Sequence, residues 1–253
     1  MSVDERLALL DYAVEAGVPA SRMLPGTGAC SLTDAVRLSA AATSHGCGGV
    51  LMLPPFYYKG VSDVGLFAFF GEVIERVGDV RLRVYLYHIP LVAQVGFSHA
   101  LIERLIKRYP VVVAGMKDTG GNWAYTAKTI ELFGAQGFDV FAGTETILLN
   151  TLRHGGVGCI SATANVNPGA IVQLFETWRD GDADAEKQQA ALNATRAIFS
   201  EYPLIPAMKA TIATATGDAQ WSRVRPPLEA LTPDQAQALG RALEAGGFSV
   251  GGL

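Results

Sequence analysis

Charged residues are scarce in this sequence. Asp, Glu, Lys and Arg make up 17% of its 253 residues, the net charge at pH 7 is −4, and no run of basic residues occurs. Proteins that bind nucleic acids or anionic membranes usually present a clustered positive surface. The composition therefore argues against a nucleic-acid partner and against a membrane partner.

Cysteine is also rare, and long apolar runs are missing. The three cysteines (Cys30, Cys47 and Cys159) are odd in number and lack paired spacing, which favours reduced thiols. No stretch approaches the roughly 18 apolar residues that a membrane span needs. Residues 2–6 do not resemble the basic start of a signal peptide. We therefore expect a cytoplasmic protein.

Several motifs that carry chemistry are absent. The chain has no G-x-G-x-x-G after a strand, no P-loop, no C-x-x-C pair and no G-x-S-x-G elbow. Its histidines are scattered without H-x-x-H spacing. These absences argue against dinucleotide binding, thiol redox chemistry, serine hydrolysis and a zinc site.

Apolar residues, by contrast, are abundant. They make up 49% of the chain, and the mean hydropathy of +0.24 favours a sheet buried on both faces and a subunit interface. Short apolar runs ending in glycine or proline alternate with helical patterns, which is typical of parallel βαβ units. A (β/α) barrel and an open doubly wound sheet both fit. The predicted strands are residues 23–28, 48–54, 83–90, 111–117, 139–143 and 157–161.

Capping signals and a change of pattern organise the rest of the chain. Ser2 and Glu5 have the spacing of a capping box at the start of the first helix. Pro168 suits a first-turn proline, and the chain after it looks entirely helical. We expect a barrel domain over residues 1–181 and a helical region over residues 182–253.

Lys117 closes a valine-rich run that is predicted to be a buried strand. Because side chains alternate along a strand, Lys117 should share a face with Val111, Val113 and Gly115. Burial disfavours a charged ammonium, and the neutral amine is the nucleophile that condenses with a ketone. The alternative is a strand-end lysine paired with Asp118 or with a loop carboxylate.

Other special residues also stand at predicted strand ends, where a barrel builds its active site. Tyr87 ends the third strand and Ser161 the sixth. A tyrosine near an imine-forming lysine can move protons, although Tyr87 could also be a half-buried tyrosine bonded to a backbone carbonyl. His88 should point to the opposite face as a packed residue. Of the other lysines, only Lys209 rivals Lys117, and it fits a helix surface or interface.

An ordered set of motifs over nearly the whole chain resembles the dihydrodipicolinate synthase/N-acetylneuraminate lyase family. The motifs are Pro-Gly-Thr-Gly-Ala at 25–29, Tyr-His-Ile-Pro at 87–90, Gly-Met-Lys-Asp-Thr-Gly-Gly at 115–121, Gly-Gly-Val-Gly-Cys-Ile-Ser at 155–161, Asn-Val-Asn-Pro at 165–168 and Arg-Pro-Pro-Leu at 225–228. The resemblance implies a TIM (β/α)8-type barrel with a C-terminal helical appendage. It further implies a homo-oligomer (a dimer or tetramer) and class I aldolase-type chemistry on pyruvate or a larger 2-oxo acid, with no metal and no organic cofactor.

The resemblance also implies roles for particular residues. Lys117 would form the Schiff base, and Tyr87 would relay protons. A second tyrosine would cross from a neighbouring subunit; it corresponds to Tyr58, with Tyr57 as the alternative because the loop holds one extra residue. The substrate would be bound by Ile160, through its backbone groups, and by Ser161 and Gly143.

The chain departs from the family pattern before its first helix. The first two βα units and their Gly-Thr-Thr-Gly-Glu type loop have no counterpart, so we expect about six of the eight barrel strands. Such a barrel would expose strand edges and part of its interior. We therefore expect Met1 to be an internal methionine of a longer reading frame, and the chain as given to be poorly soluble and weakly active.

A second departure concerns the substrate. The synthase pattern has an arginine after the Tyr-x-x-Pro motif, whereas residues 91–95 here are Leu-Val-Ala-Gln-Val. This apolar segment favours a lyase, aldolase or dehydratase acting on a sugar-derived or aromatic 2-oxo acid over a dihydrodipicolinate synthase. Two alternatives stay open: a truncated, catalytically impaired member that binds a 2-oxo acid or only oligomerises, and a pyridoxal-phosphate enzyme.

Overall fold

The computed structural model describes residues 1–251, which form two compact units. The first unit comprises Met1–Phe141 and Gly155–Val157. The second comprises Ala142–His154 and the chain from Gly158 onward. This division differs from the predicted boundary between a barrel and a helical region at residue 181, which stays a prediction.

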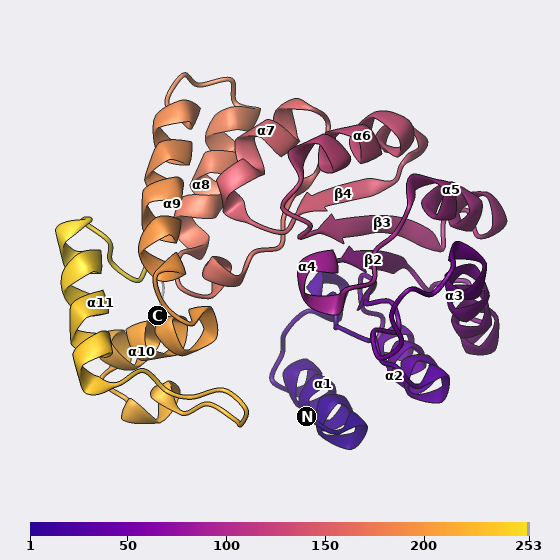
Figure 1. Ribbon diagram of the computed structural model, residues 1–253, viewed down its shortest axis with the longest axis horizontal. Coiled ribbons are helices and arrows are strands. Elements are labelled where there is room, and N and C mark those ends of the chain that lie inside the picture. Colours follow the sequence, from indigo (N-terminus) through magenta and orange to yellow (C-terminus); the bar gives the residue numbers. More distant parts are fainter. Residues whose placement is uncertain (252–253) are drawn as a thin grey trace. The chain divides into compact units, whose positions relative to one another are not determined.

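The first unit alternates strands and helices, as predicted (Figure 1). Its elements are α1 (Val3–Glu15), η1 (Ala20–Arg22), α2 (Leu32–Ser44), β1 (Val50–Met52), α3 (Asp63–Val77), β2 (Val84–His88), α4 (Pro90–Ala93), α5 (His99–Arg108), β3 (Val113–Asp118), α6 (Trp123–Phe133), η2 (Gly134–Gln136) and β4 (Asp139–Ala142). The predicted capping box is present, since the Ser2 amide donates to the Glu5 carboxylate and the Glu5 amide to Ser2 Oγ.

The described residues contain five strands, in the order β1-β2-β3-β4-β5, of which β1, β2 and β3 pair in parallel. The first predicted strand, at residues 23–28, is wrong. This stretch makes a single parallel bridge, between Gly26 and Leu51. Because Pro25 lacks an N–H, it cannot donate a hydrogen bond to a strand ladder, and the pairing does not extend.

A bulge changes the predicted face of the lysine strand. Val84 pairs with Val113, but Tyr85 pairs with Gly115, so Ala114 is passed over. Val113 therefore lies in the apolar core rather than on the face of Lys117. The prediction that Val111 belongs to the buried strand is also wrong. Val111 precedes β3, is 67% exposed and has a backbone φ of 70°.

The core of the first unit lies between the strands and their helices. Leu86 of β2 and Met116 of β3 are fully buried, together with Phe70 of α3 and Leu101 of α5. Burying such side chains contributes about 1.5–3 kcal/mol each. One face of the β2–β3 pair is thus committed to packing, and the other face carries the polar side chains described below.

The second unit is mostly helical and has two apolar clusters. Its elements are η3 (Glu145–Ile147), α7 (Leu148–Arg153), β5 (Gly158–Cys159), η4 (Ala162–Asn165), α8 (Pro168–Arg179), α9 (Ala185–Ser200), α10 (Leu204–Thr216), η5 (Ala219–Ser222) and α11 (Pro233–Ala245). Helices α8 and α9 lie side by side (Figure 1). Pro168 stands in the first turn of α8, as predicted.

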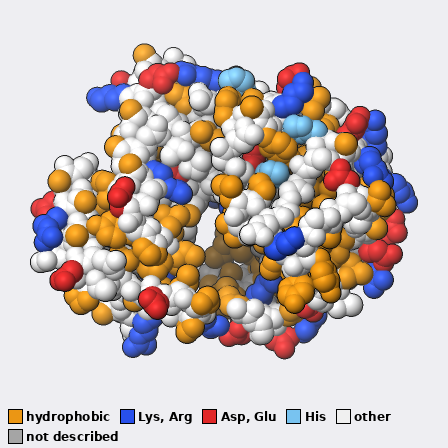
Figure 2. All heavy atoms as spheres, viewed as in Figure 1, with side chains coloured by type: hydrophobic (Ala, Val, Ile, Leu, Met, Phe, Trp, Pro, Cys, Tyr) orange, Lys and Arg blue, Asp and Glu red, His pale blue; other side chains and the backbone are white. Residues whose placement is uncertain are grey.

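Hydrophobic side chains also reach the surface, where they are mixed with charged ones (Figure 2). In the first unit, the large exposed ones include Tyr57 and Tyr58, each 74% exposed, and Leu91 and Val92 of α4, at 77% and 74%. No helix within residues 1–251 is both long and apolar enough to cross a membrane.

Gly115 has no room for a side chain. A Cβ atom there would stand 2.4 Å from the Asp139 carbonyl oxygen and 2.8 Å from the Tyr85 ring. The backbone of β3 can therefore approach β4 and Tyr85 closely only because this residue is glycine.

Replacing Gly115 by alanine should lower the free energy of unfolding by roughly 1–3 kcal/mol, because the methyl group overpacks a site bounded by backbone. Gly169→Ala in α8 is the control, since a Cβ there meets nothing within 4 Å. Urea denaturation followed by circular dichroism measures both changes. Equal effects of the two substitutions would contradict the packing argument.

Candidate active site

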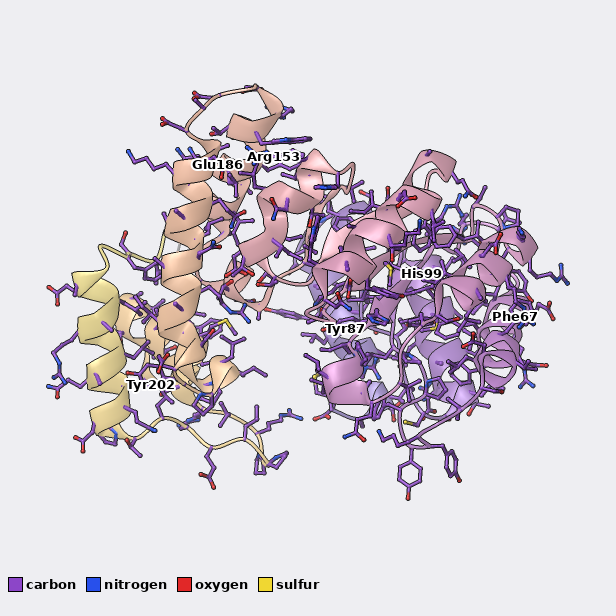
Figure 3. The ribbon with its side chains drawn as sticks, turned by 45° about the horizontal axis from the view of Figure 1, so that its top comes forward. Phe67, Tyr87, His99, Arg153, Glu186 and Tyr202 are labelled. Carbon is purple, nitrogen blue, oxygen red and sulfur yellow. The ribbon has the colours of Figure 1, made fainter. Side chains whose placement is uncertain are left out.

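The structure places Lys117 and Tyr87 next to each other. The register of β2 and β3 puts the two residues in direct pairing. Lys117 Nζ donates a hydrogen bond to Tyr87 Oη at 3.1 Å and lies 4.3 Å from the centre of the tyrosine ring. Both side chains are half-buried, and each residue lies one position before the end of its strand. Tyr87 is labelled in Figure 3. An amine and a phenol are thereby held within proton-transfer distance.

Lys117 does not pair with the carboxylate that follows it. Asp118 is 3% exposed and belongs to the opposite face of β3. Its carboxylate accepts hydrogen bonds from the Gly120 amide at 2.7 Å and from Thr126 Oγ1 at 2.5 Å. The alternative in which Lys117 is a strand-end partner of Asp118 is therefore wrong.

Tyr85 shares the face of Tyr87 but has a different environment. Its hydroxyl donates to Asp139 Oδ2 at 3.0 Å, and its ring packs edge-on against Phe141. Burial, helped by the bond to Asp139, raises the pKa of Tyr85 to about 12. The proton of this phenol is thus firmly held.

The opposite face carries a stack of aromatic rings around His88, which is buried as predicted. The Tyr125 ring lies between two histidines, 4.3 Å from the centre of the His88 ring and 4.5 Å from that of His99. His88 Nδ1 accepts a hydrogen bond from the Phe97 amide at 3.1 Å, so the neutral ring carries its proton on Nε2. Burial lowers the pKa of His88, and nearby Asp118 opposes this shift.

The predicted substrate-binding residues Gly143, Ile160 and Ser161 belong to the second unit. The Ile160 amide is already used, because it donates to the Ala142 carbonyl at 2.8 Å. The hydroxyl of Ser161 is also used, because it donates to the carboxylate of Glu145. These contacts leave the Ile160 carbonyl oxygen and the backbone groups of Gly143 for a ligand.

Sequence reasoning missed Glu145 and its partner Arg196. Glu145 is 2% exposed and follows the C-terminal end of β4 within four residues. An acidic residue directly after a predicted strand was the available signal. The contribution of Arg196 carried no local signal, because this residue lies about 50 positions further on, in α9.

Tyr57 and Tyr58 lie on the loop between β1 and α3. Their rings are 5.2 Å apart, with interplanar angle 85°. Lys59 ties this loop to the end of α4, since its ammonium donates to the carbonyls of Phe56 and Ala93.

Within residues 1–251, no group of three or more His, Cys, Asp and Glu side chains could hold a metal ion.

Comparison with known proteins adds independent information. The model of the dihydrodipicolinate synthetase family matches residues 1–246. An uncharacterized DapA-like lyase of Chloroflexus aurantiacus is 31% identical over 96% of this chain and 80% of its own length. The putative 2-dehydro-3-deoxy-D-gluconate aldolase YagE of Escherichia coli is 31% identical over 94% of this chain and 78% of its own length. The 4-hydroxy-tetrahydrodipicolinate synthase of Thermus thermophilus is 29% identical over 98% of this chain and 81% of its own length.

Solved structures agree with these sequence matches. The crystal structure of YagE in complex with pyruvate superposes with a TM-score of 0.90 at 28% identity, covering 98% of this chain and 83% of that chain. The crystal structure of the dihydrodipicolinate synthase of Agrobacterium tumefaciens gives a TM-score of 0.82 at 32% identity, covering 96% of this chain and 82% of that chain. The fold is therefore of the TIM-barrel type that these proteins share, with C-terminal helices.

Acidification should destabilise the protein through His88. Because the folded-state pKa of His88 lies below the unfolded value of 6.5, the unfolded chain binds more protons between these two values. When the pH is lowered from about 7.5 to about 5.5, and so passes through about 6.5, the free energy of unfolding should fall. Urea denaturation at several pH values measures this.

His88→Gln should flatten that pH dependence, whereas His154→Gln, on an exposed histidine, should leave it unchanged. A wild-type stability that does not change between these pH values would contradict the assignment to a buried neutral histidine.

Proposed function

Because the chain belongs to the dihydrodipicolinate synthetase family, we propose that it is a lyase in which Lys117 forms a Schiff base with a 2-oxo acid. The observation that carries this proposal is the 3.1 Å contact between Lys117 Nζ and Tyr87 Oη at the ends of two paired strands. Pyruvate in the crystal structure of YagE supports a 2-oxo acid as the substrate class.

The chemistry follows from these two groups. The lone pair of Lys117 Nζ attacks the 2-oxo carbon, and the carbonyl oxygen takes up a proton to give a carbinolamine. Loss of a proton from nitrogen and of the oxygen as water then gives the imine. Tyr87 Oη would deliver and remove these protons; its hydrogen bond with the amine supports this role. The protonated imine withdraws electrons, so that a carbon–carbon or carbon–oxygen bond further along the substrate can break or form.

The second unit would contribute backbone recognition of the substrate. With the Ile160 amide bonded to Ala142, the Ile160 carbonyl is the group assigned to accept a hydrogen bond from the carbinolamine hydroxyl or the protonated imine. Gly143 and Ser161 would shape the same end of the site. The Ser161 hydroxyl would act through Glu145 rather than on the ligand, because it already donates to that carboxylate.

The substrate class is narrowed by the segment after β2. Leu91 and Val92 of α4 point to solvent, and residues 91–95 contain no cation that could pair with a second carboxylate. This favours cleavage, condensation or dehydration of a sugar-derived or aromatic 2-oxo acid over dihydrodipicolinate synthesis. The aldolase name given to YagE is consistent with this class.

The exposed tyrosine loop supports a homo-oligomer. Two aromatic side chains at 74% exposure leave much apolar surface in water. We assign Tyr58 to the active site of a neighbouring subunit as a further proton relay. The protein would accordingly be a dimer or tetramer. In the proposed chemistry the Schiff base itself withdraws the electrons, so no metal and no organic cofactor take part.

Borohydride reduction in the presence of pyruvate should attach one reduced pyruvyl group to Lys117, because the imine is the species that borohydride traps. Mass spectrometry of the intact and digested protein measures the adduct and its position. Lys117→Ala should abolish it, and Lys209→Ala should retain it, since Lys209 lies over the Trp221 ring on the helical region. A wild-type protein that forms no adduct with any 2-oxo acid would favour the non-catalytic alternative.

Tyr87→Phe should lower the rate of imine formation by roughly 10²- to 10⁴-fold, the usual contribution of a proton-transfer group. Tyr85→Phe is the matched control on the same strand and face, and it should change the rate little because its hydroxyl is held by Asp139. Stopped reactions with borohydride give both rates. Similar losses in the two variants would argue against a specific role for Tyr87.

A further inference from the structure

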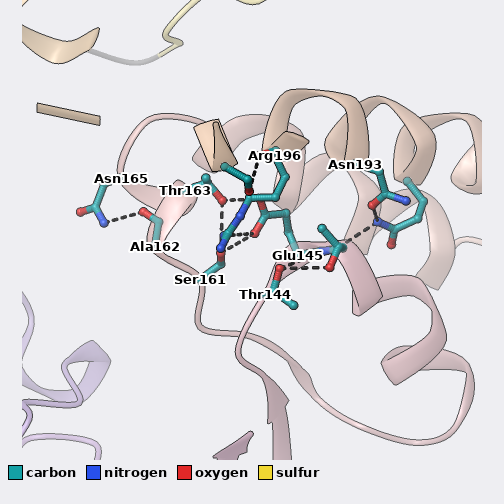
Figure 4. Close-up of polar contacts among 11 residues, drawn as sticks. Thr144, Glu145, Ser161, Ala162, Thr163, Asn165, Asn193 and Arg196 are labelled. Atoms are coloured by element: carbon teal, nitrogen blue, oxygen red, sulfur yellow. Dashed lines mark hydrogen bonds and ion pairs between the residues drawn. The ribbon is translucent and has the colours of Figure 1, made fainter. Parts of the chain in front are cut away.

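A buried carboxylate lies at the centre of a polar cluster in the second unit (Figure 4). Glu145 is 2% exposed, and its two oxygens accept hydrogen bonds from different hydroxyls, Oε2 from Ser161 and Oε1 from Thr163. Arg196 NH1 lies 3.5 Å from Oε2 and supplies the opposite charge. Thr163 is 1% exposed, so the cluster is closed to water on this side.

The cluster joins three segments that are far apart in sequence. Glu145 begins η3, Ser161 and Thr163 follow β5, and Arg196 belongs to α9. Gln189 of α9 reinforces the link, because its amide nitrogen donates to the Glu145 carbonyl and its amide oxygen accepts from the Leu149 amide, each at 2.9 Å.

Burying this charge is costly unless all its partners are present. An unpaired buried carboxylate is strongly unfavourable, and losing one partner of a buried pair is strongly destabilising. Packing alone would be served as well by apolar residues of similar volume. The cluster therefore has a geometric effect: it fixes the backbone on both sides of Ala162 in one conformation.

The residue directly before this fixed stretch is Ile160. Its amide is bonded to the Ala142 carbonyl at 2.8 Å, and the next residue is held through Ser161 Oγ. The peptide plane between Ile160 and Ser161 is thus constrained from both ends. The direction of the Ile160 carbonyl depends on these two constraints.

We propose that Glu145 is a positioning residue, which fixes the direction of the Ile160 carbonyl by holding Ser161 and Thr163. The inference rests on the proposed function for the role of that carbonyl. Glu145 is not assigned a contact with the substrate, and Arg196 lies within ion-pair distance of its carboxylate.

Three variants separate positioning from general stability. Glu145→Gln keeps the volume but puts an NH2 group where an oxygen accepts a hydroxyl, and it removes the counter-charge of Arg196. Ser161→Ala removes one contact and leaves the charge pair intact. Leu192→Ala is the control, because Leu192 is a buried residue of the same helix, α9, that provides no polar group to the cluster.

With pyruvate and borohydride trapping as the assay, KM is the pyruvate concentration that gives half-maximal trapping and kcat is the maximal trapping rate. Glu145→Gln and Ser161→Ala should each raise KM roughly 10-fold while changing kcat less than about twofold. Leu192→Ala should lower the Tm and leave KM within about twofold of the wild type. An equal rise of KM in Leu192→Ala would overturn the inference, since stability alone would then explain the effect.

Hydrogen exchange provides a readout that does not depend on catalysis. Peptides covering residues 158–166 should exchange faster in Glu145→Gln than in the wild type or in Leu192→Ala. If the wild-type protein forms no borohydride adduct, the proposed function fails, and the exchange data still decide whether Glu145 fixes this segment. Unchanged exchange in Glu145→Gln would overturn the inference whatever the activity.

Discussion

The parallel register of β2 and β3 is the constraint on which the candidate site depends. It sets Tyr87 opposite Lys117 and His88 opposite Asp118. Because side chains alternate in direction along each strand, one pair faces the reactive side while the other faces the packed side. A shift by one residue would exchange the two pairs and bury the amine against the helices. The bulge at Ala114 is what brings this register about, since it lets Val113 stay in the core while Lys117 leaves it.

Both units use the same physical solution for a buried acid. Asp118 is satisfied by a backbone amide and a threonine hydroxyl, and Glu145 by two hydroxyls and an arginine. Asp118 follows Lys117 in the sequence, and Glu145 accepts a hydrogen bond from Ser161. Lys117 and Ser161 are assigned to the substrate site, whereas neither acid is assigned a contact with the substrate. Several donors around a buried carboxylate keep its position fixed, because any movement would leave a buried polar group without partners.

Much of the fold could be predicted from local patterns. The capping box at Ser2, the proline of α8 and the strand that ends at Lys117 all depend on residues within a few positions of one another. The pairing of Lys117 with Tyr87 also followed from placing each at a strand end. The errors arose where distant residues decide the outcome. The bulge at Ala114 depends on the partner strand, and the stretch around Pro25 depends on hydrogen bonds that a proline cannot give.

The candidate site shows the same limit. The strand-end position of Ser161 was visible in the sequence, but the use of its hydroxyl was not. That use is set by Glu145, and Arg196, which completes the pair, lies in a helix much further along the chain. Periodicity predicts which face a side chain occupies, but it does not predict which neighbour satisfies it.

The hydrogen bond between Tyr85 and Asp139 gives the two phenols of β2 different chemistry. Tyr85 and Tyr87 are identical in composition and two residues apart, yet their hydroxyls have different partners, a carboxylate for Tyr85 and the Lys117 ammonium for Tyr87. A lineage that needed a second acid–base group on this face could obtain one without adding a side chain. Substituting Asp139 would leave the Tyr85 hydroxyl without this acceptor, on the same strand and the same face as Tyr87.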